Sequence, residues 1–322
     1  MSEAETGGQT ARGPLIAGLD IGGTKTHAVV AESADDTGRV IGEVRLATAI
    51  GSEGLLATLT QALTRVAATA EVDAATLAAV GIGVPGLVDP TTGALRHAIN
   101  LGIGNGPFDL AGAAARLVGG PVVVDNDTNL AALGAADVFG VHDLAYLSLG
   151  TGVSVGLVFG GTPHRGAHGM AGEIGHLPID PQGVLCECGQ RGCLETVVSG
   201  TAIARRWPAD GPLGSTAALL AAAASGDSKA IAVRDQLSGA IAAAVALAAQ
   251  AVDPELVVLG GGVADAGPPL LSAVRAALRA RAELSPLLGA FDLADRVAIV
   301  PAGGVPVGAL GALRAAREAI RS

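Results

Sequence analysis

Two stretches of the chain share one pattern of apolar and polar positions: an apolar run, a glycine-rich turn and a second apolar run. The first is LIAGLDIGGTKTHAVVAES (15–33), and the second is DLAYLSLGTGVSVGLVFGG (143–161). Short apolar runs bounded by turn residues are typical of strands, so each stretch predicts a β-hairpin. RVIGEVRLAT (39–48) predicts a third strand beside the first hairpin.

Helical and strand patterns follow each hairpin. A helix is expected to begin at Ser52, because apolar residues then recur at helical spacing. A buried strand at 77–89 ends in a turn around Pro85-Gly86, and 121–136 contains a strand, a polar junction and a helix. After the second hairpin a loop extends to about residue 194. The elements predicted beyond it are helices at 216–224 and 229–252, a strand at 255–264, and amphipathic helices at 273–284 and 308–321.

The repeated hairpin predicts an α/β protein with an internal duplication, built as two lobes around a cleft. The expected first lobe spans 15–120. The second spans 121–305 and includes a loop, 173–195, that carries every cysteine of the chain. Residues 1–14 are polar and acidic and lack the apolar segment of a signal peptide, so they predict a disordered tail.

Charge and composition exclude several classes of partner. The net charge is −10 and Lys and Arg form no cluster, which argues against a nucleic-acid surface. The most lipid-like run, 240–252, is too short to cross a bilayer and predicts a buried helix rather than a membrane partner. Three cysteines cannot all pair within one chain, and nothing suggests secretion. A reducing cytoplasmic location is expected, where clustered cysteines favour a metal site over disulfides.

Glycine clusters follow three of the predicted strands. Glycines without Cβ atoms let backbone N–H groups face phosphate oxygens, and Thr and Lys add donors and charge. One such cluster is also what a tight hairpin needs, but three at strand ends favour nucleotide binding. None matches the P-loop or Rossmann fingerprint. The clusters are Asp20-Ile21-Gly22-Gly23-Thr24-Lys25, Leu149-Gly150-Thr151-Gly152 and Gly260-Gly261-Gly262.

The cysteines and a histidine have the spacing of a metal site. His176, Cys186, Cys188 and Cys193 form H-x9-C-x-C-x4-C. Three thiolates and an imidazole make a closed tetrahedral shell for Zn²⁺, which indicates a structural rather than a hydrolytic ion. Unpaired core cysteines and a CxC redox site are the alternatives, and neither accounts for the histidine or the dense spacing.

Carboxylates flank this motif. Glu173 and Glu195 could each accept two hydrogen bonds from sugar hydroxyls, although a single such residue is more often a solvated loop acid. A zinc-pinned loop could aim both acids into one pocket. His176 could bind the metal through one ring nitrogen and a hydroxyl through the other.

A run of polar residues, Asp125-Asn126-Asp127-Thr128-Asn129, stands where an apolar strand meets a helix. Such junctions are common ligand crevices in α/β sheets. Helix capping explains part of the run, since Asp, Asn and Thr are all good N-caps. A carboxylate here could also take the proton of a hydroxyl that attacks a γ-phosphate.

These motifs, in this order, resemble the ROK family of sugar kinases and repressors. The resemblance covers nearly the whole chain from residue 15, and its most specific part is the pair of motifs ExGH and CxCGxxGCxE. It implies a two-lobed, actin-like ATPase fold, of the ribonuclease H-like kind, that closes over a hexose. It also implies a homodimer, with a tetramer left open, and a C-terminal helix (306–322) that rejoins the first lobe. The matching segments are DIGGTK (20–25), GVPGLVD (83–89), VDNDTNLAALGA (124–135), LGTG (149–152), GAHGMAGEIGH (166–176), CECGQRGCLE (186–195) and VLGGG (258–262).

The resemblance also assigns roles to residues. Asp127 matches the catalytic base. The sugar-binding positions are Asn126, Glu173, His176 and Glu195, with Gly86 and Asn100 lining the same pocket. The positions on the phosphate and Mg²⁺ side are Asp20, Gly22, Gly23, Thr24 and Lys25. The second phosphate loop contains Thr151 and Gly152, and the positions near the adenosine are Gly261 and Gly262.

The expected function is therefore an ATP-dependent hexokinase acting on the 6-hydroxyl of glucose or a close analogue, with ATP, Mg²⁺ and structural Zn²⁺. An N-acyl hexosamine kinase, a sugar-sensing regulator and a zinc-stapled scaffold are the alternatives, and polyphosphate stays open as donor. A regulator is disfavoured because only 14 residues precede the first predicted strand. Two positions depart from the family pattern: Ser154-Val155 stands where Gly-Gly is frequent, and Phe108 stands where a tryptophan is frequent.

Overall fold

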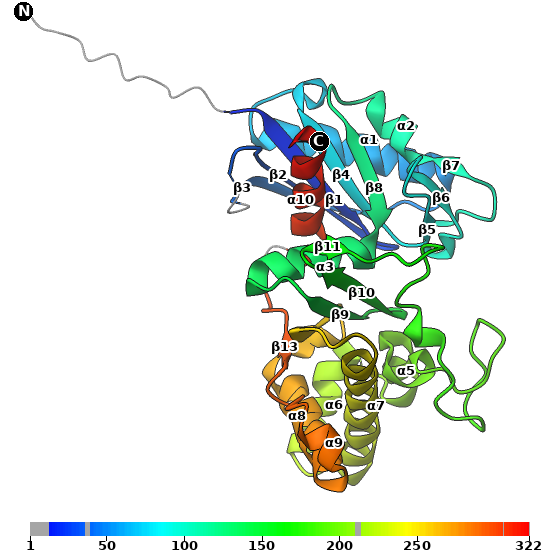
Figure 1. Cartoon of the computed structure of the whole chain (residues 1–322). Helices are drawn as coiled ribbons and strands as arrows, with labels where there is room; N and C mark the ends of the chain where they lie inside the picture. Colours follow the sequence, from blue (N-terminus) through cyan, green and yellow to red (C-terminus); the bar gives the residue numbers. More distant parts are fainter. Residues whose placement is uncertain (1–12, 36–38, 210–213, 305, 322) are drawn as a thin grey trace, which may run out of the picture. The chain divides into compact units, whose positions relative to one another are not determined.

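The computed structural model describes residues 13–35, 39–209, 214–304 and 306–321. Most of the tail expected at 1–14 lies outside these residues. Contacts divide the chain into two compact units (Figure 1). Unit 1 comprises Met1–Asp125 and Ala312–Ser322, and unit 2 comprises Asn126–Gly311.

Unit 1 is built on a five-stranded sheet in the order β3-β2-β1-β4-β8. The predicted first hairpin is confirmed: β1 and β2 are antiparallel and pair Asp20 with His27. β1 and β4 run parallel. The strands are β1 (Leu15–Ile21), β2 (Lys25–Glu32), β3 (Val40–Ala47), β4 (Ala79–Val84) and β8 (Val122–Asn126).

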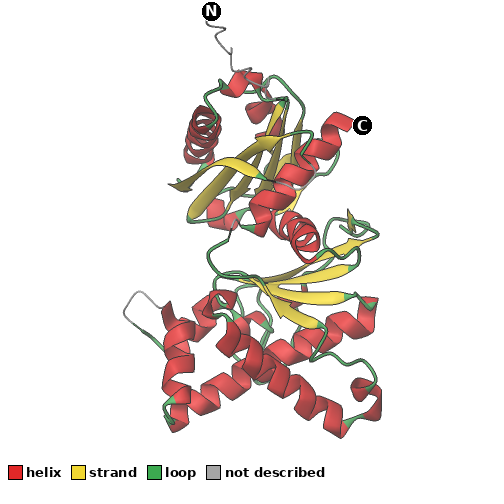
Figure 2. Cartoon of the chain, turned by 90° about the vertical axis from the view of Figure 1, so that its left-hand side faces the viewer, coloured by secondary structure: helices red, strands yellow, loops and turns green. Residues whose placement is uncertain are grey.

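Helices cover both faces of this sheet (Figure 2). The helix predicted from Ser52 is α1 (Ser52–Thr69), and its leucine face is buried against the strands. On the other face α10 (Val307–Arg321) comes so close to β4 that a Cβ on Gly81 would clash with the carbonyl of Ala312. The sequence pattern missed a small sheet, because strands of two or three residues show no periodicity. The additional elements of unit 1 are β5 (Leu87–Val88), β6 (Ala94–Arg96), β7 (Phe108–Asp109), α2 (Leu110–Ala115) and the 3₁₀ turns η1 (Ala74–Thr76) and η2 (Ile99–Leu101).

Unit 2 repeats the same strand order, β11-β10-β9-β12-β13, which bears out the predicted duplication. β9 and β10 form the second hairpin, and β9 runs parallel to β12. The sheet separates two helical layers (Figure 2). Ala145 and Leu147 of β9 pack into the larger cluster with α5 to α8, whereas Leu144 and Tyr146 pack with α3. This alternation is the period of two expected of a strand buried on both faces.

The elements of unit 2 agree with most of the predicted ranges. The sequence pattern missed α4, α5, α9 and β13, which are short. The bounds are α3 (Asp127–Phe139), β9 (Leu144–Leu149), β10 (Val153–Phe159), β11 (Thr162–Pro163), η3 (Ile174–His176), α4 (Glu195–Val198), α5 (Gly200–Arg206), α6 (Gly214–Ala224), α7 (Ser228–Val252), β12 (Leu256–Gly260), η4 (Ala264–Ala266), α8 (Pro268–Leu284), α9 (Pro286–Gly289) and β13 (Val297–Ile299).

The division between the units lies after β8 rather than before it. The sequence pattern assigned the strand at 121–126 to the second lobe, but β8 completes the sheet of unit 1. The chain passes directly from Asn126, the last residue of β8, to Asp127, the first residue of α3. No turn or glycine marks this passage, so the hydrophobic pattern alone could not locate it.

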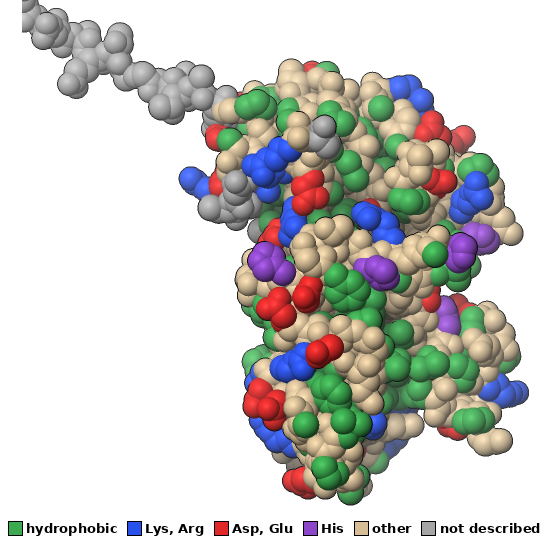
Figure 3. Space-filling view, viewed as in Figure 1, with side chains coloured by type: hydrophobic (Ala, Val, Ile, Leu, Met, Phe, Trp, Pro, Cys, Tyr) green, Lys and Arg blue, Asp and Glu red, His purple; other side chains and the backbone are tan. Residues whose placement is uncertain are grey.

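Charge and hydropathy agree with a folded, mixed-charge protein. On the face drawn in Figure 3, Lys and Arg side chains are interspersed with Asp and Glu and form no single band. Among the described residues, α7 is long and apolar enough to cross a membrane by length and composition. Half of its most apolar window is buried inside the folded chain, as expected of a core helix.

Gly134 of α3 lies against the start of α10 within unit 2. A Cβ on Gly134 would stand 2.7 Å from the backbone nitrogen of Gly311 and would clash with the carbonyl of Val307. Backbone atoms cannot rotate away as a flexible side chain can. Gly134→Ala is therefore expected to lower the free energy of unfolding by about 1–3 kcal/mol, measured by urea titration.

Gly239→Ala is the matched control, because that helical glycine has no atom within 4 Å of an added Cβ. It is expected to raise the free energy of unfolding by up to about 1 kcal/mol, from helix propensity. Equal stability of the two variants would contradict the close approach at Gly134.

Candidate active site

The polar run at the start of α3 combines capping with a carboxylate. Asn126 is the N-cap: its Oδ1 accepts hydrogen bonds from the backbone N–H groups of Thr128 (2.9 Å) and Asn129 (3.3 Å). The capping role that the sequence left open among several residues thus belongs to Asn126. Asp127 is the first helical residue, so its carboxylate is not the N-cap of α3.

The bonds that hold the Asp127 carboxyl fall on one oxygen. Its Oδ1 accepts from the backbone N–H of Thr128 at 2.8 Å and from the Thr128 hydroxyl at 3.3 Å. Burial raises the pKa of Asp127, the bonds from Thr128 oppose this, and the nearby Glu173 raises it further. A carboxylate with a raised pKa is poorly solvated and accepts a proton more readily.

Glycines bring the acidic loop onto the edge of β10. The N–H of Val155 donates to the carbonyl of Gly172 at 2.8 Å. Gly172 has a φ of 92°, and a Cβ there would clash with the Val155 carbonyl. Gly175 is pressed against Val153 in the same way. Because only glycine tolerates these positions, Glu173 is held next to β10.

Glu195 reaches the same strand from the other side of the cysteine motif. Its Oε2 accepts from the backbone N–H of Val153 at 3.0 Å, and its Oε1 lies 4.0 Å from the Cys186 Sγ. Partial desolvation raises the pKa of Glu173; His176 opposes this, and Glu195 adds to it. Within unit 2, Glu173 therefore lies within electrostatic range of three residues predicted from separate motifs: Asp127, His176 and Glu195.

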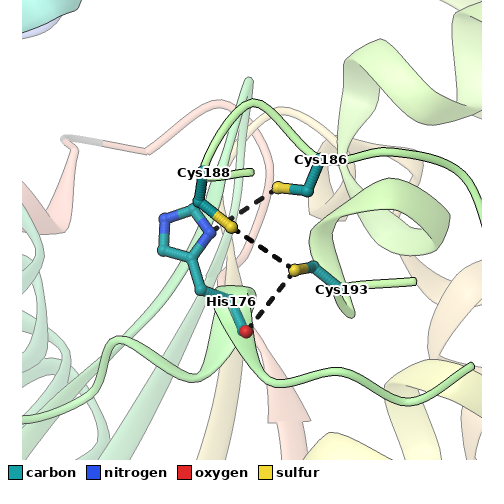
Figure 4. A group of neighbouring side chains, drawn as sticks. All are labelled: His176, Cys186, Cys188 and Cys193. Atoms are coloured by element: carbon teal, nitrogen blue, oxygen red, sulfur yellow. Dashed lines mark hydrogen bonds between the residues drawn. The ribbon is translucent and has the colours of Figure 1, made fainter. Parts of the chain in front are cut away.

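The four predicted metal ligands form one cluster (Figure 4). The donor atoms of His176, Cys186, Cys188 and Cys193 all lie within 4.8 Å of one another. His176 Nδ1 is 3.8 Å from the Cys186 Sγ, and the sulfurs of Cys188 and Cys193 are 3.6 Å apart. Zn–S bonds of about 2.3 Å in a tetrahedron place ligands about 3.8 Å apart. Donor set and spacing therefore fit Zn²⁺.

The thiols of the cluster differ in pKa, since burial raises the pKa of the Cys193 thiol to about 12. Hydrogen bonds from Gln190, the backbone bond foremost, lower the pKa of the Cys188 thiol to about 6. Because Nδ1 of His176 faces the sulfurs, the imidazole Nε2 is the nitrogen left for a ligand outside the cluster. A bound Zn²⁺ would tie the loop before Glu195 to the loop after Glu173 and fix the separation of the two acids.

The two glycine loops of unit 2 lie side by side. The Val263 N–H donates to the Leu149 carbonyl at 2.9 Å, and a Cβ on Gly261 would stand 2.7 Å from the Leu149 carbonyl carbon. Thr151, Gly152, Gly261 and Gly262 are thus grouped at the ends of the parallel strands β9 and β12.

Two residues that the sequence pattern did not single out join this group. The Gly200 N–H donates to the Gly150 carbonyl at 2.8 Å, and the Thr201 hydroxyl lies 3.4 Å from the Thr151 carbonyl. Their signal in the sequence is Ser199-Gly200-Thr201, in which Ser199 caps α5.

The remaining predicted residues belong to unit 1. Asp20 stands near the end of β1, opposite Gly83 of the parallel strand β4. Gly22, Gly23 and Thr24 form the turn that leads into Lys25 at the start of β2. A Cβ on Gly23 would lie 3.0 Å from the Asn100 Cβ, so the predicted phosphate turn and Asn100 are neighbours.

Gly86 follows β4 with a φ of 108°. A Cβ there would stand 2.8 Å from the carbonyl oxygen of Arg96. The positive φ and the close approach both require glycine at this position.

Comparisons with known proteins agree with this arrangement. The sequence profile of the ROK family matches residues 16–311. A glucokinase of Halalkalibacterium halodurans is 35% identical over 80% of this chain and 83% of that protein. An N-acetylmannosamine kinase of Yersinia pseudotuberculosis is 36% identical over 76% of this chain and 82% of that protein.

Solved structures extend the likeness to the fold. The crystal structure of a ROK family glucokinase from Streptomyces griseus, in complex with glucose and AMPPNP, superposes with a TM-score of 0.74 and 31% identity. The superposition covers 94% of this chain and 99% of the Streptomyces griseus chain. The duplicated sheet, the acidic and cysteine motifs and these matches together establish that the chain belongs to the ROK family.

Proposed function

We propose that the protein is an ATP-dependent hexokinase that phosphorylates the 6-hydroxyl of glucose or a close analogue. The observation that carries the proposal is the meeting of Asp127, Glu173, His176 and Glu195 beside the second glycine loop. The Asp127 carboxyl accepts hydrogen bonds through Oδ1, and the Glu173 and Glu195 carboxyls flank the group of His176 and three cysteines, whose donor set fits Zn²⁺.

Each part of this group has a task in phosphoryl transfer. Glu173 and Glu195 accept hydrogen bonds from sugar hydroxyls, and the free Nε2 of His176 contacts another. Asp127 takes the proton of the attacking hydroxyl as the oxygen–phosphorus bond forms. The glycine loops hold the triphosphate, and Mg²⁺ neutralises its charge on the side of Asp20. Positioning and charge stabilisation supply most of the rate in such reactions.

The relatives favour glucose over an amino sugar without separating the two completely. Glucokinases and a glucose complex are among the similar proteins, but an N-acetylmannosamine kinase is similar as well. The two substrate classes differ at the 2-position of the ring. The homodimer and the cytoplasmic location expected from the sequence stay predictions.

The decisive test is a substrate panel. With ATP and Mg²⁺, kcat/KM is measured for glucose, mannose, fructose, N-acetylglucosamine and N-acetylmannosamine, and the glucose assay is repeated with polyphosphate. Glucose with ATP is expected to give the highest kcat/KM. If kcat/KM is higher for either acylated sugar, that sugar replaces glucose as the proposed substrate. If no sugar in the panel stimulates ADP release, the kinase function itself is refuted.

A further inference from the structure

Ser154 departs from the frequent Gly-Gly of the second glycine loop, and the structure gives its side chain a partner. The Ser154 Oγ lies 2.8 Å from the Thr128 Oγ1. The Thr128 hydroxyl in turn lies 3.3 Å from the Asp127 Oδ1. A strand residue of the glycine hairpin is thereby connected to the carboxyl at the start of α3.

Chemistry sets the direction of these bonds. An ionised carboxylate only accepts, so the single proton of the Thr128 hydroxyl goes to Asp127. The Thr128 oxygen must then accept the hydroxyl proton of Ser154. The result is a row of two hydrogen bonds, from Ser154 to Thr128 and from Thr128 to Asp127. Two hydroxyls that donate in the same direction polarise each other, so the bond to the carboxylate is stronger than Thr128 alone would make it.

The surroundings keep the three side chains in place. Thr128 is buried, with 7% of its surface exposed. Helix α3 rests directly on β10, because Gly156 has no Cβ: one there would stand 2.7 Å from the Ala132 Cβ. Ser154 therefore faces the first turn of α3 where helix and strand are in close contact, which restricts movement of the two side chains.

The same stretch of β10 also holds the other acids. The N–H of Val153 donates to Glu195, and the N–H of Val155 donates to the carbonyl of Gly172, next to Glu173. Ser154 lies between these two residues. Three successive residues of one strand thus contact the three segments that carry Asp127, Glu173 and Glu195.

We propose that Ser154 is a positioning residue, which acts through Thr128 to fix the Asp127 carboxyl with Oδ1 occupied and Oδ2 presented to the sugar hydroxyl. The inference rests on the proposed kinase function for its catalytic meaning. The bonding itself has consequences that are measurable without catalysis. Without the donor row, Asp127 rotates more freely and its negative charge loses a stabilising bond.

Kinetics test the catalytic meaning. Ser154→Ala and Thr128→Val are each expected to lower kcat about 3- to 10-fold, the range of one lost hydrogen bond, with the sugar KM unchanged within about twofold. The kcat of the double variant should fall no further than that of either single variant, because both substitutions break the same row of hydrogen bonds. Ser154→Thr and Thr128→Ser, which keep the hydroxyls, should recover most of the rate.

Ser148→Ala is the matched control, since Ser148 is the cross-strand neighbour of Ser154 on β9. It is expected to leave kcat unchanged. A parental kcat in Ser154→Ala, or losses that add in the double variant, would overturn the proposal.

A titration separates this proposal from the kinase function. The Asp127 carboxyl is followed by ¹³C NMR with labelled aspartate and assigned with Asp127→Asn. Thr128→Val removes the hydrogen bond that the Thr128 hydroxyl donates to Asp127, and Ser154→Ala weakens it. Both changes raise a carboxyl pKa, so Asp127 should titrate at higher pH in these variants than in the parent and Ser148→Ala. Glu173, the charged neighbour that acts on Asp127, is unchanged in all of them. Unaltered titration would overturn the proposal even if the protein phosphorylated no sugar.

Discussion

Asp127→Asn is expected to lower kcat for sugar phosphorylation by about 10²–10⁴-fold, the contribution of a positioned general base. Asn keeps the shape of the side chain and an oxygen that can accept from Thr128, but it cannot take a proton. The sugar KM should change little, because the proposed function assigns most contacts with the sugar hydroxyls to Glu173, Glu195 and His176. Steady-state kinetics with ATP in excess measure both parameters.

Asp137→Asn, on the exposed C-terminal part of the same helix, is the matched control and is expected to retain parental kcat. A kcat near the parental value in Asp127→Asn would remove Asp127 from the role of base. A large rise in KM at unchanged kcat would assign it to substrate binding instead.

The same substitution should not weaken the fold. The pKa of Asp127 is raised above its usual 3.8 in the folded protein, chiefly by burial. Stability from such a group is fully present below pH 3.8 and is lost as the pH rises through the folded pKa. At pH 7, well above 3.8, the raised pKa of Asp127 therefore costs stability, and Asn, which does not titrate, removes that cost. Urea titration at pH 7 should give Asp127→Asn a free energy of unfolding equal to or above that of the parent.

The parts of the fold that the sequence predicted are those with a long apolar repeat or a glycine that only one geometry explains. The two hairpins, α1 and α7 extend over enough residues for their period to be seen. The repeated hairpin predicted the duplication, whereas the strand order that the two sheets share came from the structure. The cysteine cluster could be predicted because few arrangements other than a metal site need four such residues so closely spaced.

Other features depend on contacts that no local pattern carries. Asn126 and Asp127 are both good helix-cap residues, and only the position of the first helical turn separates the cap from the candidate base. Gly200 and Thr201 join the glycine loops because α5 begins beside Gly150, which is a long-range contact. The bond between Ser154 and Thr128 joins residues 26 positions apart and has no sequence signal of its own.

The clustering of acids explains why a metal would be needed in this loop. Glu173 raises the pKa of Asp127, and Glu195 contributes, after burial, to the raised pKa of Glu173. Between η3 and α4 the loop 177–194 has no helix or ladder of its own beyond isolated bridges at Pro178 and Leu185. On β10, the N–H of Val155 donates to the Gly172 carbonyl and the N–H of Val153 donates to the Glu195 carboxylate, which holds the segments on either side of the loop. The Leu194 N–H donates to the Leu177 carbonyl, and the cluster of His176 with the cysteines adds a second connection between the loop ends.

Loss of that cluster is accordingly expected to affect both structure and substrate binding. Cys193→Ser should reduce bound zinc from about one ion per chain to near zero, because a structural site depends on its complete ligand set. Cys193 is fully buried against the loop, so its loss also frees the start of α4 and with it Glu195. A displacement of about 1 Å in such a group can cost about 10²-fold in rate, and the fall should appear in kcat/KM for the sugar. Metal analysis, urea titration and kinetics on the same preparation measure the three effects.

Glu187→Gln provides the matched control, because this exposed residue lies between Cys186 and Cys188 in the same loop and is no ligand. It should keep its zinc, its stability and its kcat/KM. Treatment of the parent with a strong chelator should reproduce the Cys193→Ser phenotype, and added Zn²⁺ should reverse it in the parent but not in the variant. If the variant lost its zinc and still phosphorylated sugar at the parental kcat/KM, the cluster would be a passive feature of the loop. The convergence of Glu173, His176 and Glu195 would then have to rest on the contacts with β10 alone.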